Sequence, residues 1–255
     1  MKRLNFAAAP IAAVTILMCG AMVAACKPSE QRVAQDVERK RIECLDKPCE
    51  GDTTPTFNPT REQLIKLNGQ WFVAPKAYVK GFAGLAFYWP SKTPLIGRDD
   101  GTDYPEKSRD YYDVAIEIFL TGRQRWPDPR AEKPWEGKGW DGRFEELRKQ
   151  GLRIEREMLR PELERVRFFD AQGKQYRHEY FLATTQRKTL GDGVPGVACD
   201  LPDPRPKALP RCTGGVFWQE DVYADFRFHA KHAVDWPAIN QEIVRVLNLA
   251  KKVQP

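Results

Sequence analysis

The chain has 255 residues, of which 42% are hydrophobic, and its formal net charge is +6 at pH 7. This length suits one domain or two small ones. Basic and acidic residues are mixed along the sequence, without a run of five or more like charges, and this mixture argues against a nucleic-acid-binding protein.

Residues 1–25 have the pattern of a signal peptide. Lys2 and Arg3 form a positive n-region, and a mostly apolar run from Phe6 to Ala25 follows them. The run ends in Val23-Ala24-Ala25-Cys26, which resembles the lipobox of bacterial lipoproteins, where a signal peptidase cuts before the cysteine and the cysteine is acylated. We therefore expect Cys26 to be the lipidated first residue of the mature chain. The alternative is ordinary secretion with a free Cys26.

The acyl anchor sets the expected location of the protein. Each buried methylene contributes about 0.8 kcal/mol, so two or more acyl chains hold a protein stably where one does not. Retention at the inner membrane usually needs Asp after the lipidated cysteine, and this chain has Lys27. We expect anchoring at the outer membrane, with residues 26–58 as a flexible tether and residues 59–255 as a single binding domain in the periplasm.

Four cysteines follow Cys26, and an even number in an exported chain predicts disulfides. Three pairings are possible. We favour the two local ones, Cys44–Cys49 and Cys199–Cys212, because each brackets a loop-like segment. The chain-entropy model gives about 2 kcal/mol for the shorter loop and about 3 kcal/mol for the longer one. A zinc site is the alternative, although the paired C-x-x-C spacing typical of zinc is absent.

The first half of the expected domain predicts a short helix followed by strands. The pattern at residues 60–63 is a capping box, which would open a helix that ends at Asn68-Gly69. The segments at residues 70–75 and 84–90 are short aromatic and β-branched runs, and both end in proline. Residues 111–120 alternate between apolar and other side chains, which predicts a half-buried strand.

The second half predicts two hairpins. Residues 163–169 and 174–184 flank a DAQG turn in which Gly173 would take a positive φ. Residues 216–218 and 222–228 flank a second turn. Strands joined by tight turns are typical of an antiparallel sheet.

Two helices complete the predicted fold. Asp141 would cap one, and Asp235 would cap a stronger amphipathic helix that ends near Lys251 and Lys252. Strands paired by turns, together with a few helices that include a C-terminal one, predict a single α+β domain built on an antiparallel sheet.

Catalytic and metal-binding motifs are missing from the sequence. No serine lies in G-x-S-x-G. The segment His229–Asp235 (HAKHAVD) is similar to the H-x-K-x4-D signature of phospholipase D, but only three residues separate Lys231 from Asp235 and no second copy is present. His229 and His232 are three residues apart, whereas the histidines of zinc proteases are four apart. We expect no enzyme, no cofactor and no metal ion.

Two segments are candidates for a partner-binding surface. The stretch from Arg123 to Trp140 is rich in Trp and Arg, the residue types that dominate binding hot spots. Alternatively, its tryptophans fold back onto the sheet. The loop from Trp89 to Tyr104 is the second candidate, and its acidic cluster leaves calcium open as an alternative. The candidate residues are Arg123, Arg125, Trp126, Arg130, Trp135 and Trp140 in the first segment, and Trp89, Lys92, Arg98, Asp99, Asp100, Asp103 and Tyr104 in the second.

Several phrases resemble those of a known group of periplasmic lipoproteins, which are encoded beside type VI secretion phospholipase effectors of Gram-negative bacteria and act as immunity proteins. The phrases are NGQWFVAPK, FYWPSKTPLIGRDDGTDYPE, YDVAIEIFL, LRPELERVR and KHAVDWPAINQEIVRVL. The resemblance spans about residues 44–250, and it implies that this chain binds and neutralises a toxic phospholipase or lipase. The alternative is an envelope-assembly or scaffold lipoprotein with an endogenous partner.

Lipidation is directly testable. Intact-mass analysis of the membrane fraction is expected to show an acylated chain that begins at Cys26, and the variant Cys26→Ala is expected to leave that fraction. A mature N-terminus elsewhere, or a membrane-bound Cys26→Ala protein, would contradict the lipobox interpretation.

Overall fold

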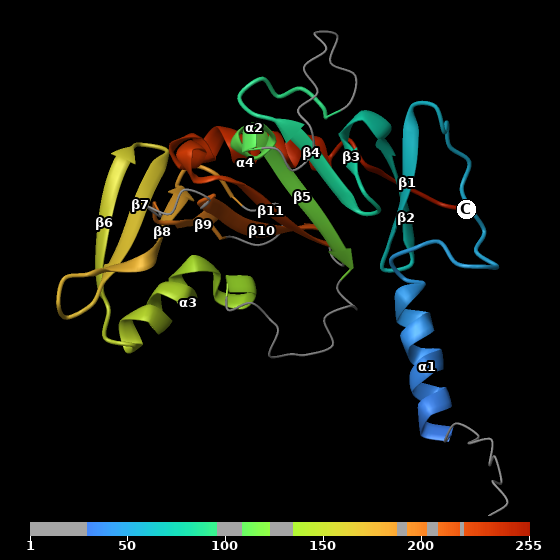
Figure 1. Cartoon of the computed structure of the whole chain (residues 1–255), viewed down its shortest axis with the longest axis horizontal. Coiled ribbons are helices and arrows are strands. Elements are labelled where there is room, and N and C mark those ends of the chain that lie inside the picture. The colour runs from blue at the N-terminus through green and yellow to red at the C-terminus, as the bar shows by residue number, and fades with distance from the viewer. Residues whose placement is uncertain (1–29, 96–108, 123–134, 188–192, 203–208, 220–221) are drawn as a thin grey trace, which may run out of the picture. The chain divides into compact units, whose positions relative to one another are not determined.

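The computed structural model describes residues 30–95, 109–122, 135–187, 193–202, 209–219 and 222–255 (Figure 1). Residues 1–37 and residues 38–255 are separate units, and the larger unit holds both β-sheets. Helix α1 (Glu30–Glu43) crosses the sequence boundary between the two units. None of the helices in these described ranges is long and apolar enough to cross a membrane.

Nine described strands form the larger sheet, in which neighbouring strands are antiparallel throughout. A smaller antiparallel sheet has three strands. The α+β class and the antiparallel sheet predicted from the sequence are confirmed. The small sheet has the order β1 (Glu62–Leu67), β2 (Gln70–Pro75), β12 (Lys251–Val253). The large sheet has the order β3 (Val79–Lys80), β4 (Gly84–Tyr88), β5 (Ala115–Gly122), β11 (Val222–His229), β10 (Arg211–Gln219), β9 (Gly196–Asp200), β8 (Gln175–Ala183), β7 (Leu163–Phe169), β6 (Arg153–Arg160).

Residues 60–69 belong to a hairpin, so the short helix predicted there was wrong. Strand β1 pairs with β2 across a two-residue loop, in which Asn68 and Gly69 have φ values of 49° and 75°. Positive φ at both central residues is the geometry of a type I′ turn, for which Asn-Gly is a preferred sequence. The strand pairing buries Ile65 and Leu67. The Asn-Gly pair therefore marks a hairpin turn and not a helix end.

The strand predicted at residues 111–120 is correct only in its second part, because helix α2 (Arg109–Val114) precedes β5. The helical turn brings the Tyr111 hydroxyl to 3.1 Å from a carboxylate oxygen of Glu117, to which it donates a hydrogen bond. From the first residue of β5 onward the predicted alternation holds, and every second side chain from Ile116 to Leu120 enters the main core.

Both predicted hairpins are confirmed. Strands β7 and β8 pair across a turn in which Gly173 has a φ of 78°. Strands β10 and β11 also pair, and β10 begins at Arg211, ahead of the predicted start at Val216. Strand β9, which was not predicted, pairs with both β8 and β10 and so joins the two hairpins into one sheet.

Helix α4 (Trp236–Leu247) lies where the C-terminal helix was predicted, and Asp235 occupies its N-cap position. The Asp235 side chain makes no capping bond, and one of its oxygens accepts a hydrogen bond from the indole N–H of Trp89 at 3.1 Å. Lys251 and Lys252 lie beyond the helix, in β12. The first predicted helix is longer than expected: α3 (Trp135–Lys149) begins ahead of Asp141, which therefore caps no helix.

Helices α3 and α4 lie on opposite faces of the large sheet (Figure 1). On the α4 face, the fully buried Trp236 stacks on Phe226 and Phe228 of β11, with ring centroids 5.3 and 6.1 Å apart. Its indole N–H donates to the carbonyl of Pro195 at 3.1 Å. The same core contains Phe72 of β2, so one hydrophobic core joins α4 and both sheets.

On the other face, helix α3 packs over the part of the sheet formed by β7 and β8. Its buried side chains Trp140, Phe144 and Leu147 recur at helical spacing and meet Phe168 and Tyr180 of the strands. The ring centroids of Phe144 and Tyr180 are 5.2 Å apart in an edge-to-face arrangement. This second core fixes α3 on the sheet.

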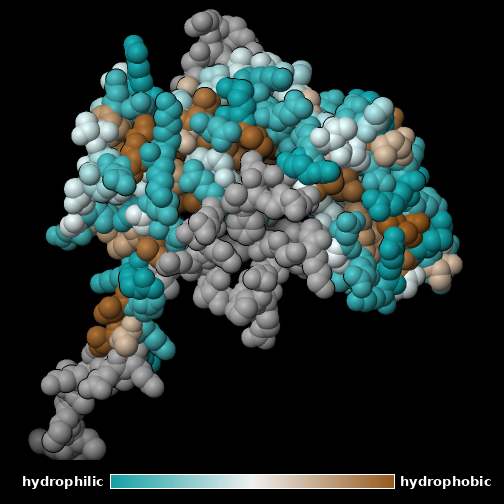
Figure 2. Space-filling model, turned by 180° about the vertical axis from the view of Figure 1, so that it is seen from behind, coloured by the Kyte–Doolittle hydropathy of each residue, from teal (hydrophilic) through white to brown (hydrophobic). Residues whose placement is uncertain are grey.

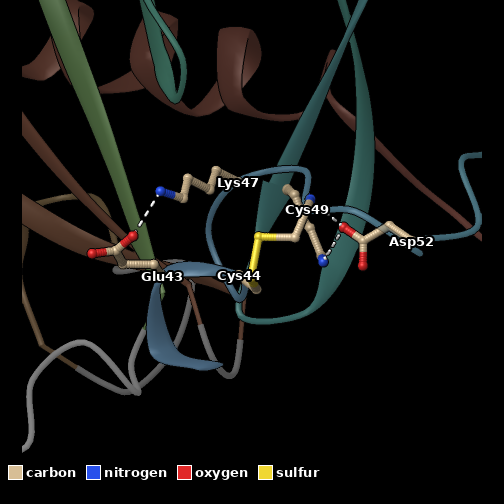
Figure 3. Close-up of a disulfide and its surroundings, with 6 residues drawn as sticks. Glu43, Cys44, Lys47, Cys49 and Asp52 are labelled. Atoms are coloured by element: carbon tan, nitrogen blue, oxygen red, sulfur yellow. Dashed lines mark hydrogen bonds and ion pairs between the residues drawn. A yellow bond between two sulfur atoms is a disulfide. The ribbon is translucent and has the colours of Figure 1, made fainter. Parts of the chain in front are cut away.

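The segment just before β1 is attached to the domain. Figure 3 shows the Cys44–Cys49 disulfide beside Asp52, whose carboxylate accepts a hydrogen bond from the Cys49 N–H at 2.7 Å. Asp52 also pairs with Lys66 of β1 at 2.6 Å. The disulfide and the ion pair thus connect residues 44–52 to β1.

Both predicted disulfides are present. The second one joins Cys199 and Cys212, which are directly opposed in β9 and β10. Both of these cysteines are fully buried in the main core. The local pairing is therefore confirmed, and the zinc alternative for these four cysteines is wrong.

Two phenylalanines near β4 provide a matched test of this core. The variant Phe87→Ala is expected to lower the free energy of unfolding by about 3–5 kcal/mol, because the fully buried ring would leave a cavity. The variant Phe82→Ala is expected to change it by less than about 0.5 kcal/mol, because that side chain is 87% exposed. Urea unfolding of both variants measures the difference, and similar losses would contradict the assignment of the core.

Candidate partner-binding site

Most of the partner-binding residues predicted from the sequence lie outside the described residues. Trp135 is the first residue of α3. Lys92 is exposed, and its ammonium nitrogen lies 5.6 Å from the ring centroid of Trp89. The residues outside the described ranges are Arg98, Asp99, Asp100, Asp103, Tyr104, Arg123, Arg125, Trp126 and Arg130. The calcium alternative falls on the same undescribed acidic cluster.

Trp89 and Trp140, which the sequence placed at a partner-binding surface, are both largely buried, and Trp140 also lines the pocket described below. Trp89 is 6% exposed and belongs to the main core. Trp140 is 9% exposed and packs edge-to-face on Tyr180, with ring centroids 5.5 Å apart. It also lies over Gly196, where a Cβ atom would come within 2.3 Å of the indole nitrogen. For Trp140 the structure agrees with the alternative that a tryptophan folds back onto the sheet.

A pocket of about 330 Å³ lies between α3 and strands β8 to β11. It combines two aromatic rings with several charged or polar side chains, which is the composition expected of a binding site. Its position places it on the α3 face of the large sheet. The lining residues are Trp140, Arg143, Arg177, His178, Tyr180, Ala198, Thr213, Gly214 and Asp225.

Short side chains in the middle of the sheet create this hollow. Four residues on neighbouring strands form one row across the sheet, in which each is directly opposed to the next. They are Tyr180 of β8, Ala198 of β9, Thr213 of β10 and Arg227 of β11. Directly opposed residues of antiparallel strands point to the same face. The row therefore places two small side chains between two large ones, and α3 supplies the remaining wall.

The pocket lining is positively charged on balance, because it holds two guanidinium groups and one carboxylate. Arg143 of α3 contacts Glu146 at 3.3 Å, an exposed pair that contributes little. Arg177 forms no side-chain hydrogen bond or ion pair with any other residue in the described ranges. Asp225 of β11 is the carboxylate.

Two titratable groups in the pocket favour their neutral forms. Burial lowers the pKa of His178, and Arg177 and Arg143 lower it further, whereas Asp200, 3.8 Å away, opposes the shift. Burial raises the pKa of Tyr180, and Arg143 opposes this shift in part. Both arginines thus act on His178, so their positive charges converge on the same part of the pocket.

A second hollow, of about 370 Å³, lies between the small sheet and the segment that precedes it. Its lining is mainly apolar, with Phe57, Leu64 and Trp71, and its charged residues are Glu62 and Lys76. It lacks the converging arginines of the first pocket. We therefore take the pocket beside α3 as the candidate site.

A buried carboxylate lies on the same face of the sheet. Glu117 is 2% exposed and is directly opposed to Arg227, with which it forms an ion pair. Lys80 forms a second ion pair with it, and Tyr111 donates a hydrogen bond. Burial alone would raise the pKa of Glu117, but the hydrogen bonds from Arg227 and Lys80 outweigh burial and lower it. This cluster binds α2 and three strands together.

The HAKHAVD segment has a structural role in this fold. The Nε2 atom of His232 lies 2.8 Å from the carbonyl oxygen of Asp113, and the Nδ1 atom of His229 accepts a hydrogen bond from the Lys231 N–H at 3.1 Å. The His232 contact joins the 3-10 helix η4 (Ala230–Asp235) to α2, and the His229 contact caps the start of η4. In the part of the chain that the structure describes, no group of three or more His, Cys, Asp or Glu side chains is arranged to hold a metal ion.

Most of the pocket residues could not be predicted from a local sequence pattern. Arg143 lies three residues after Trp140, so helical periodicity alone brings it near the tryptophan-rich segment. Arg177, His178 and Asp225 lie on strands whose pairing is set by distant parts of the chain. Only the sheet order places them together.

The surface seen in Figure 2 is mixed in character. On this face, hydrophobic residues gather in separate patches among hydrophilic ones. Exposed large apolar side chains that occur singly are normal in soluble proteins. The described part of this face therefore offers no single wide apolar surface to a partner.

No protein-family model matches this chain, and no match was found among curated proteins or solved structures. The functional interpretation of the pocket therefore depends on its geometry and on the sequence patterns given above.

The buried carboxylate predicts a pH-dependent stability. The variant Glu117→Gln is expected to lower the free energy of unfolding at pH 7 by about 2 kcal/mol, because it removes the charged hydrogen-bond acceptor of Lys80 and Arg227, whose side chains are 18% and 37% exposed. Because the pKa of Glu117 is lowered from its ordinary value of 4.5, its contribution is present above that pH and is lost as the pH falls below it. The difference in the free energy of unfolding between the wild type and the variant, measured by urea unfolding, should therefore become smaller below about pH 4.5.

The exposed Glu157 is the control for this prediction. It pairs with Arg165 at 2.6 Å on the surface, so Glu157→Gln is expected to change stability by no more than about 1 kcal/mol. Two results would contradict the role assigned to the cluster around Glu117. One is an equal loss of stability in both variants, and the other is a loss for Glu117→Gln that does not depend on pH.

Proposed function

We propose that this chain is a periplasmic lipoprotein, anchored in the outer membrane by acyl chains on Cys26, that binds and neutralises a toxic phospholipase or lipase delivered by type VI secretion. It is thus an immunity protein that acts by binding. The resemblance to immunity lipoproteins motivates the proposal, and two features of the chain support it.

The observation that carries the proposal is that helix α3 belongs both to the segment predicted to bind a partner and to the wall of the pocket. This helix contains Trp135 and Trp140, the end of the segment rich in Trp and Arg, and also Arg143, which lines the pocket. The segment predicted to bind a partner and the positively charged pocket are therefore continuous through one helix, and Arg177 is available in the pocket because no described side chain pairs with it.

The two disulfides support the proposed compartment. Disulfides form and persist in oxidising environments such as the periplasm and are rare in the cytosol. The signal-peptide pattern and the disulfide-bonded domain are consistent with each other, because an exported chain passes into that environment.

A tight inhibitor complex needs more contact than the pocket offers. A standard protein–protein interface buries about 800 Å² on each partner. We therefore propose that the pocket provides a central polar contact and that the surface around α3 provides the rest. Hot spots of this kind lie near the centre of an interface and are shielded by less important contacts.

A protection assay tests the function. The test uses a lipase encoded beside the gene for this chain, the neighbouring lipase. Cells that export this lipase to the periplasm are expected to stop growing, and co-expression of the full-length chain is expected to restore growth because the domain meets the toxin there. A version without residues 1–25, which stays in the cytoplasm, is expected to give no protection.

The control is a catalytically inactive lipase, which should leave growth unaffected with or without the chain. Continued growth arrest despite export of the full-length chain would reject the immunity role. A partner recovered from the envelope-assembly machinery instead of the lipase would favour the scaffold alternative.

A further inference from the structure

The pocket beside α3 has a charge balance that suits one particular kind of group. Arg143 and Arg177 contribute two positive charges and Asp225 contributes one negative charge. With His178 neutral, the formal charge of the residues that line the pocket is +1. Glu146 pairs with Arg143 from outside the lining, whereas Arg177 has no side-chain partner among the described residues, so a group with a single negative charge would balance the lining.

We propose that this pocket receives an acidic side chain, Asp or Glu, of the partner protein, which Arg143 and Arg177 bind through their guanidinium groups. This inference depends on the proposed function, because it names the chemistry by which the chain recognises the lipase. A guanidinium group presents a planar fork of N–H donors that matches the two oxygens of a carboxylate.

The immediate surroundings favour a carboxylate over a phosphate. A phosphate group carries up to two negative charges, and Asp225 in the same lining would repel the second one. Trp140, Tyr180 and Ala198 supply apolar contacts for the methylene groups that precede a side-chain carboxylate. The neutral hydroxyl of Thr213 adds a donor on the floor of the pocket.

The partial burial of the pocket allows the ion pair between the arginines and the partner's carboxylate to contribute to affinity. Exposed ion pairs contribute little, because water screens them. The side chain of Arg143 is 23% exposed, and a docked partner would exclude more water from it. Charged hydrogen bonds between partners become stronger in such an environment, and removing one member leaves the other charge buried without a counterpart.

His178 reports the charge of the occupant. The charged groups that act on it are Asp200 on β9, Arg177 on its own strand and Arg143 on α3, and Asp225 on β11 lines the same pocket. An added carboxylate favours the protonated imidazole and raises the pKa of His178, whereas a neutral or cationic occupant that only excludes water lowers it. The chain has three histidines, so their NMR signals are simple to separate.

The binding experiment uses the full domain and the catalytically inactive form of the neighbouring lipase. The variants Arg143→Ala and Arg177→Ala are each expected to bind the lipase about thirtyfold more weakly than the wild type, the effect of removing a central arginine hot spot. Arg177→Lys is expected to fall between the wild type and Arg177→Ala, because lysine keeps the charge but loses the planar fork.

Matched controls remove the same charge from outside the pocket. Arg61 is exposed just before β1, and Lys174 is exposed just before β8. The variants Arg61→Ala and Lys174→Ala are expected to bind within about twofold of the wild type, because residues outside the hot spot contribute little to affinity. A thermal melt of each variant separates loss of binding from loss of fold.

The outcomes distinguish the two proposals. If the wild type does not bind the lipase, the proposed function fails and this inference fails with it. If the wild type binds and both pocket variants bind equally well, the function stands and the acidic-side-chain inference is overturned. If the pocket variants lose affinity but the pKa of His178 falls in the complex while His229 and His232 are unchanged, the occupant is not acidic and the inference is again overturned. A rise in the pKa of His178 supports it.

Discussion

The burial of Trp236 is the contact on which the rest of the structure depends. This indole stacks on two phenylalanines of β11, and its N–H donates to a carbonyl of the loop before β9. It thereby fixes α4 on one face of the large sheet, and β12, which follows α4, pairs with β2 of the small sheet. Aromatic side chains bury large areas, so one such residue at the start of a helix can determine how that helix packs. The opposite face of the sheet is then the one that α2 and α3 cover.

That second face produces the candidate site through the distribution of residue sizes. Large aromatic residues near β7 and β8 hold α3, and the ion cluster around Glu117 holds α2. Between them, Ala198, Thr213 and Gly214 have short side chains or none. A hollow forms where large side chains surround small ones. The charged residues that line it then determine which chemical groups it favours. The fold and the proposed recognition of an acidic group are connected in this way.

The sequence predicts those parts of the fold that have a local cause. The amphipathic pattern of α4, the turn chemistry at Gly173 and the short loops between cysteines each specify their own element, and these predictions are confirmed. The prediction failed at Asn68-Gly69, which suits a helix end and a hairpin turn equally, and only pairing with β2 decides between them. Trp140 was assigned to a surface because of its proline- and glycine-rich neighbours, although Trp140, Phe144 and Leu147 have helical spacing. The pocket itself depends on the strand order β8-β9-β10-β11, which no local pattern encodes.

The central claim is that the chain neutralises a lipase by binding it, and an inhibition titration tests this most directly. The hydrolysis rate of the purified neighbouring lipase on phospholipid vesicles would be measured as increasing amounts of the purified domain are added. Neutralisation by binding predicts that the rate falls toward zero as the lipase is saturated, and that a domain with Arg143 and Arg177 both changed to Ala requires a much higher concentration to reach the same inhibition. A hydrolysis rate that stays unchanged in the presence of excess wild-type domain would contradict the account.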